Sequence, residues 1–287
     1  MSDLDAATRD IPVGETAVRV YAAGPDEGRP VVLLHGGGMD AASLSWKEVF
    51  PALSETHRVY ALDWPGYGES DPVPEEETPH VDYYADVLGA VLADLDLVEA
   101  TLVGISKGGG IALGYTLDRP ARVARLCLVD SYGLGGEVPG GVLGAAYVKA
   151  PKLLEATWWA MRRSRRVTRA SIENLVNPAN LDEAFVDDAR REVRRPNAGD
   201  AYRRFQRAEV GWRGLRTNYA DRMSELPVPT LFIHGEDDDL IPLEQSKAAA
   251  DAAPVADLFT LAACGHWPPR EHPEAFVARL EAWLQRG

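Results

Sequence analysis

The sequence predicts an α/β protein whose core is a mostly parallel, doubly wound sheet, interrupted by an inserted helical cap. Short β-branched runs alternate with helical spacings of apolar residues through the first half of the chain, which is typical of parallel strands joined by crossover helices. After about residue 134 the pattern changes to a glycine-rich connector and a helical segment that reaches about residue 225. The strand pattern then resumes, so we expect one core formed by residues 1–134 and 226–287 and a cap formed by residues 135–225.

The expected strands are short and follow one another along the core. The run VVLLHG at residues 31–36 begins with four consecutive apolar residues, as expected where helices cover both faces of a sheet. Further strands are expected at residues 17–24, 58–63, 101–106, 125–130, 228–235 and 256–266. Helices are expected at residues 81–97 and 107–117, and residues 273–287 have the amphipathic pattern of a closing surface helix.

Charge and composition limit the partners of this chain. Its 287 residues include 44 acidic and 30 basic side chains, and the net charge of −14 disfavours binding to nucleic acid and to acidic membrane surfaces. We therefore expect a small-molecule substrate, while the oligomeric state stays open. The first residues lack a signal-peptide pattern and no run of 18 apolar residues occurs, which predicts a cytoplasmic protein. The two cysteines, Cys127 and Cys264, lack metal-ligand spacing.

A glycine-flanked serine lies where an expected strand meets an expected helix. Gly104-Ile105-Ser106-Lys107-Gly108 has the pattern G-x-S-x-G, a sharp turn that exposes a nucleophilic serine. An alcohol needs a base to accept its proton and an acid to orient that base. Downstream, the sequence EDDD at residues 236–239 offers the acid and His266 offers the base, in the chain order serine, acid, histidine.

Two further glycine-bearing motifs accompany this set, namely HGGG at residues 35–38 and DWPGYGES at residues 63–70. With them the chain resembles the α/β-hydrolase family at both ends, outside the inserted middle. The resemblance implies a catalytic triad formed by Ser106, Asp238 and His266. It implies no metal and no cofactor.

The acid of this triad has neighbours and a rival. Asp237 and Asp239 flank Asp238 and are expected to belong to a solvated acidic turn. Some members of the family place the acid after the strand that here ends at Asp130, so Asp130 is the main alternative. The resemblance favours Asp238, because it lies three positions after Gly235 at the end of an expected strand.

The resemblance also implies an oxyanion hole built from backbone. The N–H groups of Gly37 and Lys107 are expected to hold the developing negative charge, and Gly36 and Gly38 are expected beside the substrate. Glycines suit this task because they let a substrate approach the backbone closely. The side chain of Lys107 is expected to point toward the cap or toward solvent.

A serine hydrolase that cleaves a small carboxylic ester through an acyl-enzyme is the expected function. The first alternative is hydrolysis of a carbon–carbon bond in a vinylogous diketone, because CGHW and REHPEAF resemble one branch of the family that catalyses this reaction. The second alternative, from another class, is a non-catalytic ligand receptor on the same fold.

Resemblance to the carbon–carbon hydrolase branch also implies particular substrate-binding residues. It places a tryptophan after the catalytic histidine at the pocket, which makes Trp267 an expected substrate contact. A cap arginine is expected to bind the substrate carboxylate, and Arg190 or the adjacent Arg191 could serve. This chain departs from the branch at Met39-Asp40, where the branch usually has Pro-Gly.

Overall fold

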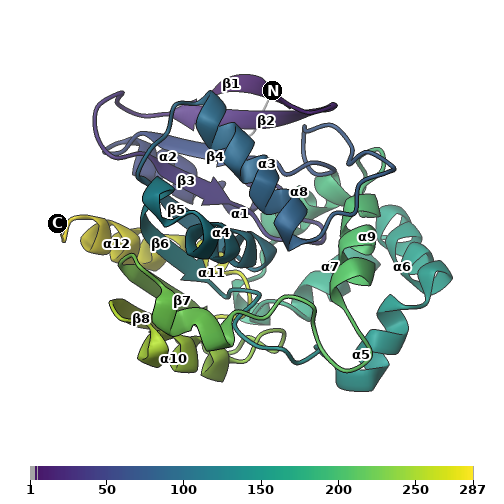
Figure 1. Cartoon of the computed structure of the whole chain (residues 1–287). Helices are drawn as coiled ribbons and strands as arrows, with labels where there is room; N and C mark the ends of the chain where they lie inside the picture. Colours follow the sequence, from purple (N-terminus) through teal and green to yellow (C-terminus); the bar gives the residue numbers. More distant parts are fainter. Residues whose placement is uncertain (1–3, 5, 287) are drawn as a thin grey trace.

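The computed structural model describes Leu4 and residues 6–286, and the expectations that fall on residues 1–3, 5 and 287 lie outside the described residues. Eight strands form one sheet in the order β1-β2-β4-β3-β5-β6-β7-β8 (Figure 1). The pairs β1–β2 and β2–β4 are antiparallel, and every other neighbouring pair is parallel. The expected fold class, an α/β protein with a mostly parallel, doubly wound sheet, is confirmed.

Seven of the strands coincide with the apolar runs of the sequence. In chain order the strands are β1 (Ala7–Val13), β2 (Thr16–Ala23), β3 (Val31–Leu34), β4 (Val59–Leu62), β5 (Ala100–Ile105), β6 (Val123–Val129), β7 (Thr230–Gly235) and β8 (Ala256–Leu261). The sequence does not predict β1, because Ile11 is its one fully buried side chain and the strand therefore lacks an apolar run. It forms an antiparallel hairpin with β2 at the edge of the sheet.

Both faces of the sheet are covered, and alternate residues of each central strand serve opposite faces. In β3, Val31 and Leu33 belong to one apolar cluster and Val32 and Leu34 to the other, with all four side chains buried. Because successive side chains of a strand point to opposite faces, two helical layers are needed to remove these residues from water. The doubly wound arrangement therefore follows from the continuous apolar character of the central strands.

Helices before and after the insertion supply the two layers (Figure 1). On one face lie α3 (Val81–Asp94), α4 (Lys107–Asp118) and α10 (Leu243–Ala252), whose buried residues join the second cluster. On the other face lie α1 (Ala42–Ser45), α2 (Val49–Ser54), α11 (Pro268–Glu271) and α12 (Pro273–Leu284), together with the first cluster. Short 3₁₀ turns occur at η1 (Pro120–Arg122), η2 (Pro178–Asn180) and η3 (Ala220–Glu225).

The segment between β6 and β7 is helical and lies beside the sheet (Figure 1). Its helices are α5 (Gly141–Val148), α6 (Pro151–Arg163), α7 (Arg165–Glu173), α8 (Glu183–Val193) and α9 (Asp200–Glu209). This is the segment for which the sequence predicts a cap. Among the described helices, none is long and apolar enough to cross a membrane.

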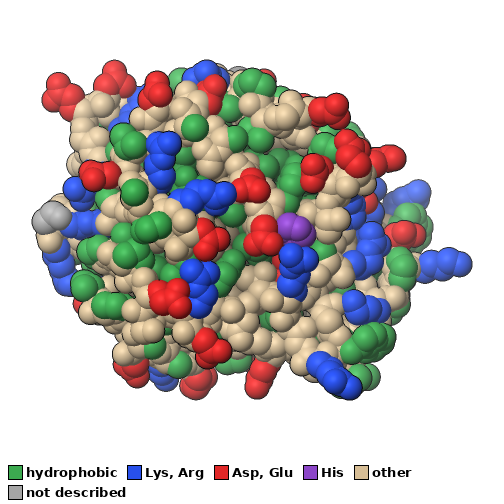
Figure 2. Space-filling view, in the orientation of Figure 1, with side chains coloured by type: hydrophobic (Ala, Val, Ile, Leu, Met, Phe, Trp, Pro, Cys, Tyr) green, Lys and Arg blue, Asp and Glu red, His purple; other side chains and the backbone are tan. Residues whose placement is uncertain are grey.

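The surface mixes both signs of charge. Figure 2 shows acidic and basic side chains interspersed on the face that it presents. Many of them form ion pairs at the surface, for example Arg119 with Asp86 at 2.6 Å and Arg286 with Asp257 at 2.7 Å. These pairs leave the surplus of acidic side chains unchanged, and the basic side chains on the face shown in Figure 2 lie among acidic ones.

Candidate active site

Ser106 lies in a sharp turn between β5 and α4, as the nucleophile elbow requires. Its backbone has φ 52° and ψ −121°, and a positive φ is strained for a residue with a side chain. The flanking glycines are needed for close backbone approach. A Cβ on Gly104 would lie 2.5 Å from the carbonyl oxygen of Gly108, and a Cβ on Gly108 would overlap the backbone at the end of β3. The two glycines therefore let the helix fold back against the sheet directly after the serine.

His266 and Asp238 form a buried pair in the loops that follow β8 and β7. Nδ1 of His266 lies 2.7 Å from Oδ2 of Asp238, while Oδ1 accepts hydrogen bonds from the peptide N–H groups of Leu240 and Ile241 at 2.8 and 3.1 Å. Burial alone would raise the pKa of Asp238, but His266 and these donors hold it below its ordinary value. Burial lowers the pKa of His266, and the neighbouring carboxylate outweighs burial and raises it overall.

The rival acid Asp130 does not contact His266. Its Oδ1 accepts a hydrogen bond from the N–H of Gly235 at 3.0 Å and lies 3.2 Å from Nε2 of His234. Burial and the charge of Asp238 raise the pKa of Asp130 well above its ordinary value, which favours a neutral carboxyl. The acids on either side of Asp238 are exposed. The geometry thus pairs the histidine with the carboxylate that the sequence favours.

One group of potential metal ligands occurs among the described residues. Ligand atoms of Asp130, His234 and Asp238 all lie within 4.8 Å of one another. Both ring nitrogens of His234 already bond to other protein groups, and Asp238 is engaged by His266. The three side chains therefore serve protein contacts and do not form a free ligand set.

The glycine loop after β3 lies against the serine. A Cβ on Gly36 would be 3.3 Å from Cβ of Ser106, and a Cβ on Gly37 would be 2.6 Å from the ring of Tyr202 on α9. The loop is thus enclosed by the nucleophile on one side and by the inserted segment on the other. Lys107 opens α4, where a backbone N–H has no acceptor within its helix. Gly37 and Lys107 can therefore offer the two N–H groups of an oxyanion hole.

The side chain of Lys107 does not point to solvent, because the residue is 2% exposed. Its Nζ lies 3.9 Å from the ring centroid of Tyr67 and 4.0 Å from that of Tyr84. The rings of Trp64 and of Phe205, which belongs to the inserted α9, are farther away at 5.5 and 5.8 Å. The ammonium has no hydrogen-bond partner among the described residues. Burial consequently lowers the pKa of Lys107 well below its ordinary value.

A cavity of about 450 Å³ joins these parts of the site. Ser106 and His266 both line it, together with the three glycines of the loop, Gly36, Gly37 and Gly38. Most of the remaining lining is apolar or aromatic and comes from the inserted helices, for example Leu154, Trp158, Met161, Tyr202 and Phe205. Because the inserted segment supplies these walls, it determines the shape of the space above the serine.

Trp267 lines the cavity that contains Ser106, as expected, whereas Arg190 does not line it. Trp267 lines the cavity, its ring packs edge-on to Phe185 and its Nε1 donates a hydrogen bond to Oγ of Ser45 at 2.7 Å. Arg190 does not line the cavity, and the neighbouring Arg191 is exposed. Helix α8 turns an apolar face into the core, so the two arginines lie to the side of that face. Nη1 of Arg190 is nevertheless buried without a hydrogen-bond partner among the described residues, and binding of the substrate by a cap arginine stays a prediction.

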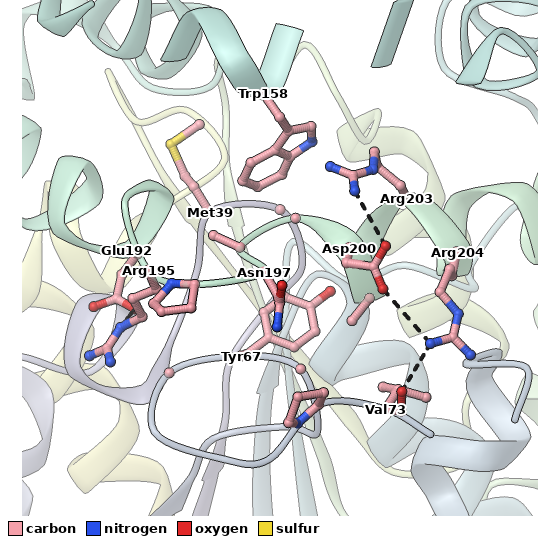
Figure 3. Close-up of a pocket in the computed structure, with 18 of the residues that line it drawn as sticks. Met39, Tyr67, Val73, Trp158, Glu192, Arg195, Asn197, Asp200, Arg203 and Arg204 are labelled. Carbon is pink, nitrogen blue, oxygen red and sulfur yellow. Dashed lines mark hydrogen bonds and ion pairs between the residues drawn. The ribbon is translucent and has the colours of Figure 1, made fainter. Parts of the chain in front are cut away.

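A second cavity, of about 560 Å³, adjoins the first (Figure 3). The two share Gly38, Met39, Asp40 and Trp158 in their linings. The second cavity is polar, and its arginines are engaged: Asp200 pairs with Arg203 and Arg204 at 3.3 and 3.8 Å (Figure 3). We therefore assign the reacting atoms to the first cavity, which contains the serine.

Sequence reasoning missed several residues of the site. Tyr202 and Phe205 approach the glycine loop and the lysine from the inserted segment, and Tyr84 reaches the lysine from α3. No motif marks these positions, because ordinary helical spacing of apolar residues also describes them. Asp40 does carry a signal, since it departs from the glycine of the related branch at this position of the loop.

Comparisons with known proteins agree with the fold. The family model described as alpha/beta hydrolase fold matches residues 29–273. A curated relative, the 2-hydroxymuconate semialdehyde hydrolase of Pseudomonas sp. (strain CF600), is 31% identical over 264 residues, which cover 90% of this chain and 87% of the relative.

Solved structures extend the likeness. A meta-cleavage product hydrolase from Pseudomonas fluorescens IP01 is 25% identical, with a TM-score of 0.80 and coverage of 96% of this chain and 97% of that chain. A thermophilic esterase from Thermogutta terrifontis has a TM-score of 0.75 at 24% identity, with 99% of each chain covered. The second likeness, at that identity, concerns the fold alone. From the family match and the curated relative together, this chain belongs to the alpha/beta hydrolase fold family.

Proposed function

We propose that this hydrolase cleaves a carbon–carbon bond in a vinylogous diketone of the 2-hydroxy-6-oxo-dienoate class. The observation that carries the proposal is the set of curated relatives: they include the 2-hydroxymuconate semialdehyde hydrolase at 31% identity and a 2-hydroxy-6-oxononadienedioate/2-hydroxy-6-oxononatrienedioate hydrolase from Cupriavidus pinatubonensis at 28%. Both relatives are covered over most of their length. Named hydrolases among the relatives also disfavour the receptor alternative.

The site offers the parts that this reaction needs. Asp238 holds His266 with hydrogen on Nδ1, so Nε2 can accept a proton from Ser106 or from a water molecule. After the dienol has been converted to the ketone by protonation at carbon, the oxygen nucleophile adds to the carbonyl. The resulting oxyanion is held by the N–H groups of Gly37 and Lys107. Collapse of this intermediate breaks the C–C bond, and the carbon fragment leaves as an enolate that takes up a proton. When Ser106 is the nucleophile, a water molecule activated by Nε2 of His266 then hydrolyses the acyl-enzyme and releases the acid.

Trp267 supports the same assignment. It follows the histidine directly and lines the cavity that contains Ser106. Its indole N–H is engaged by Ser45, which holds the ring edge-on to Phe185. A flat, fixed ring of this kind suits the planar conjugated chain of a dienoate.

Ester hydrolysis remains a second candidate because of one specific observation. No arginine lines the catalytic cavity, and the single lysine that lines it has its ammonium enclosed by aromatic rings. A dienoate carboxylate would therefore find no exposed cation in this cavity, whereas an ester of a small apolar acid would need none. The apolar walls from the inserted helices would accept such an acyl group.

The two candidates are separated by measuring kcat/KM for both substrates with the same preparation. We expect the value for 2-hydroxy-6-oxo-2,4-heptadienoate to exceed that for p-nitrophenyl butyrate by at least about 10-fold, a difference of about 1.4 kcal/mol in activation free energy. Ser106→Ala is the control and should abolish both activities. A ratio in favour of the ester would overturn the proposal and make ester hydrolysis the function.

A further inference from the structure

Asp40 lies at the centre of a buried network beneath the glycine loop. Its Oδ2 accepts a hydrogen bond from the N–H of Gly36 at 2.6 Å, and its Oδ1 accepts one from the N–H of Ala41 at 2.8 Å. The hydroxyl of Ser45 donates to the same carboxylate, and Ser45 in turn accepts the indole N–H of Trp267. The network thus connects the residue after the catalytic histidine with the loop of the oxyanion hole.

The other side of Gly36 is held as well. Nε2 of His35 accepts a hydrogen bond from the N–H of Trp64 at 3.1 Å, so Nδ1 carries the hydrogen and donates it to the carbonyl of Gly36 at 3.0 Å. Burial, together with the charge of Lys107, lowers the pKa of His35 well below its ordinary value and keeps this tautomer neutral. The carbonyl of Gly36 belongs to the same planar peptide as the N–H of Gly37. Fixing Gly36 at both ends therefore fixes the direction of that N–H.

The buried carboxyl of Asp40 is satisfied by hydrogen bonds from Gly36, Ala41 and Ser45. Lys107 and Asp40 both line the catalytic cavity and act on each other through space without a direct ion pair. Burial raises the pKa of Asp40 to about 7, although its hydrogen bonds and Lys107 oppose this rise. The other titratable groups that face Asp40 are His35, His266 and Tyr67. Nδ1 of His35 lies 3.9 Å from Oδ2 of Asp40, and the charge of Asp40 contributes to the raised pKa values of His266 and Tyr67.

We propose that Asp40 is a positioning residue that holds the peptide of Gly37 in the geometry of an oxyanion hole. The inference rests on the proposed function only in requiring Ser106 chemistry with an oxyanion intermediate, and it holds for either candidate substrate. Asp40 acts through Gly36, so it should affect the transition state more than the binding of the ground state.

The test combines steady-state kinetics with a transition-state mimic. The variant is Asp40→Asn, and Asp188→Asn is a matched control because Asp188 is another buried carboxylate, paired with Lys47 and Arg270. The readouts are kcat and KM with p-nitrophenyl butyrate, the affinity for an alkyl trifluoromethyl ketone, and the rate of Ser106 labelling by a fluorophosphonate.

For Asp40→Asn we expect kcat to fall about 10- to 100-fold. Complete removal of one oxyanion donor lowers kcat about 10²- to 10³-fold, and a misplaced donor should have a smaller effect. KM should change by less than about 2-fold, and affinity for the ketone should fall by the same factor as kcat/KM. The control should keep both values. A purely structural role would lower the thermal midpoint without moving the ratio of ketone affinity to KM.

Failure of the inference and failure of the proposed function give different results. A wild type that the fluorophosphonate does not label would refute Ser106 chemistry itself. A labelled wild type with unchanged kcat, ketone affinity and labelling rate in Asp40→Asn would refute the positioning role alone. If Asp40→Asn does not fold, Ser45→Ala removes one donor to Asp40, and we expect kcat to fall about 3- to 10-fold with matching loss of ketone affinity. Wild-type values in that variant would also refute the role.

Discussion

Replacing Asp238 by asparagine tests the acid of the proposed triad. Oδ1 of Asp238 accepts two peptide N–H donors, while Oδ2 faces Nδ1 of His266 at 2.7 Å. In Asp238→Asn the amide oxygen should keep the two peptide donors, so the amide nitrogen takes the place of Oδ2. Its N–H donates to Nδ1 and stabilises the tautomer with hydrogen on Nε2, which can no longer accept the proton of Ser106. We expect kcat to fall about 10⁴-fold, or about 5.4 kcal/mol in activation free energy.

Steady-state kinetics with p-nitrophenyl butyrate provide the measurement, and urea unfolding shows whether the variant keeps its fold. Asp130→Asn is the matched control, because Asp130 is equally buried in the same cluster but bonds to Gly235 and not to His266. We expect this control to lose less than about 10-fold in kcat. The assignment would be refuted if Asp130→Asn lowered kcat more than Asp238→Asn and if Asp238→Asn kept more than a tenth of the wild-type kcat.

Three further outcomes are expected. Because Asp238 raises the pKa of His266, the neutral base forms above the ordinary histidine pKa of 6.5, so kcat/KM should rise with pH through a midpoint above 6.5; a midpoint below 6.5 would contradict this. In Gly37→Ala the new Cβ would lie 2.6 Å from the ring of Tyr202, so the oxyanion loop must shift, the thermal midpoint should fall and kcat of the folded protein should fall about 10- to 100-fold; wild-type turnover would show that the loop does not act. With a net charge of −14, the thermal midpoint should rise with KCl up to about 0.5 M as repulsion is screened, and a flat response would show that the surplus charge has little energetic effect.

Local patterns were sufficient for the core and for most of the catalytic set. The apolar run that ends at Ile105 and the glycines around Ser106 together predict the turn, because only glycine tolerates the backbone contacts on either side of it. The edge strand β1 was missed because it is largely exposed and needs few apolar residues, so it shows no apolar run in the sequence. The comparisons, and not any local pattern, moved the preferred reaction from ester to carbon–carbon hydrolysis.

Side-chain direction was harder to predict. Lys107 was expected near the cap or solvent because an isolated lysine is rarely buried. The structure buries it because aromatic rings from three separate segments, including the inserted α9, close around its ammonium. The position of the Arg190 side chain was equally hard to predict, since the rotation of α8 about its axis depends on its packing against the core.

The sequence by itself determined the α/β class and the strand before Ser106, because each depends on residues close together in the chain, and it displayed the order of serine, acid and histidine directly. Only the tertiary structure decided which contacts these residues make. Trp267 and Ser45 are 222 positions apart, and Asp238 and His266 are 28 apart, yet both pairs are hydrogen-bonded. Contacts of this kind depend on how strands and helices pack in three dimensions, and no local pattern records that packing.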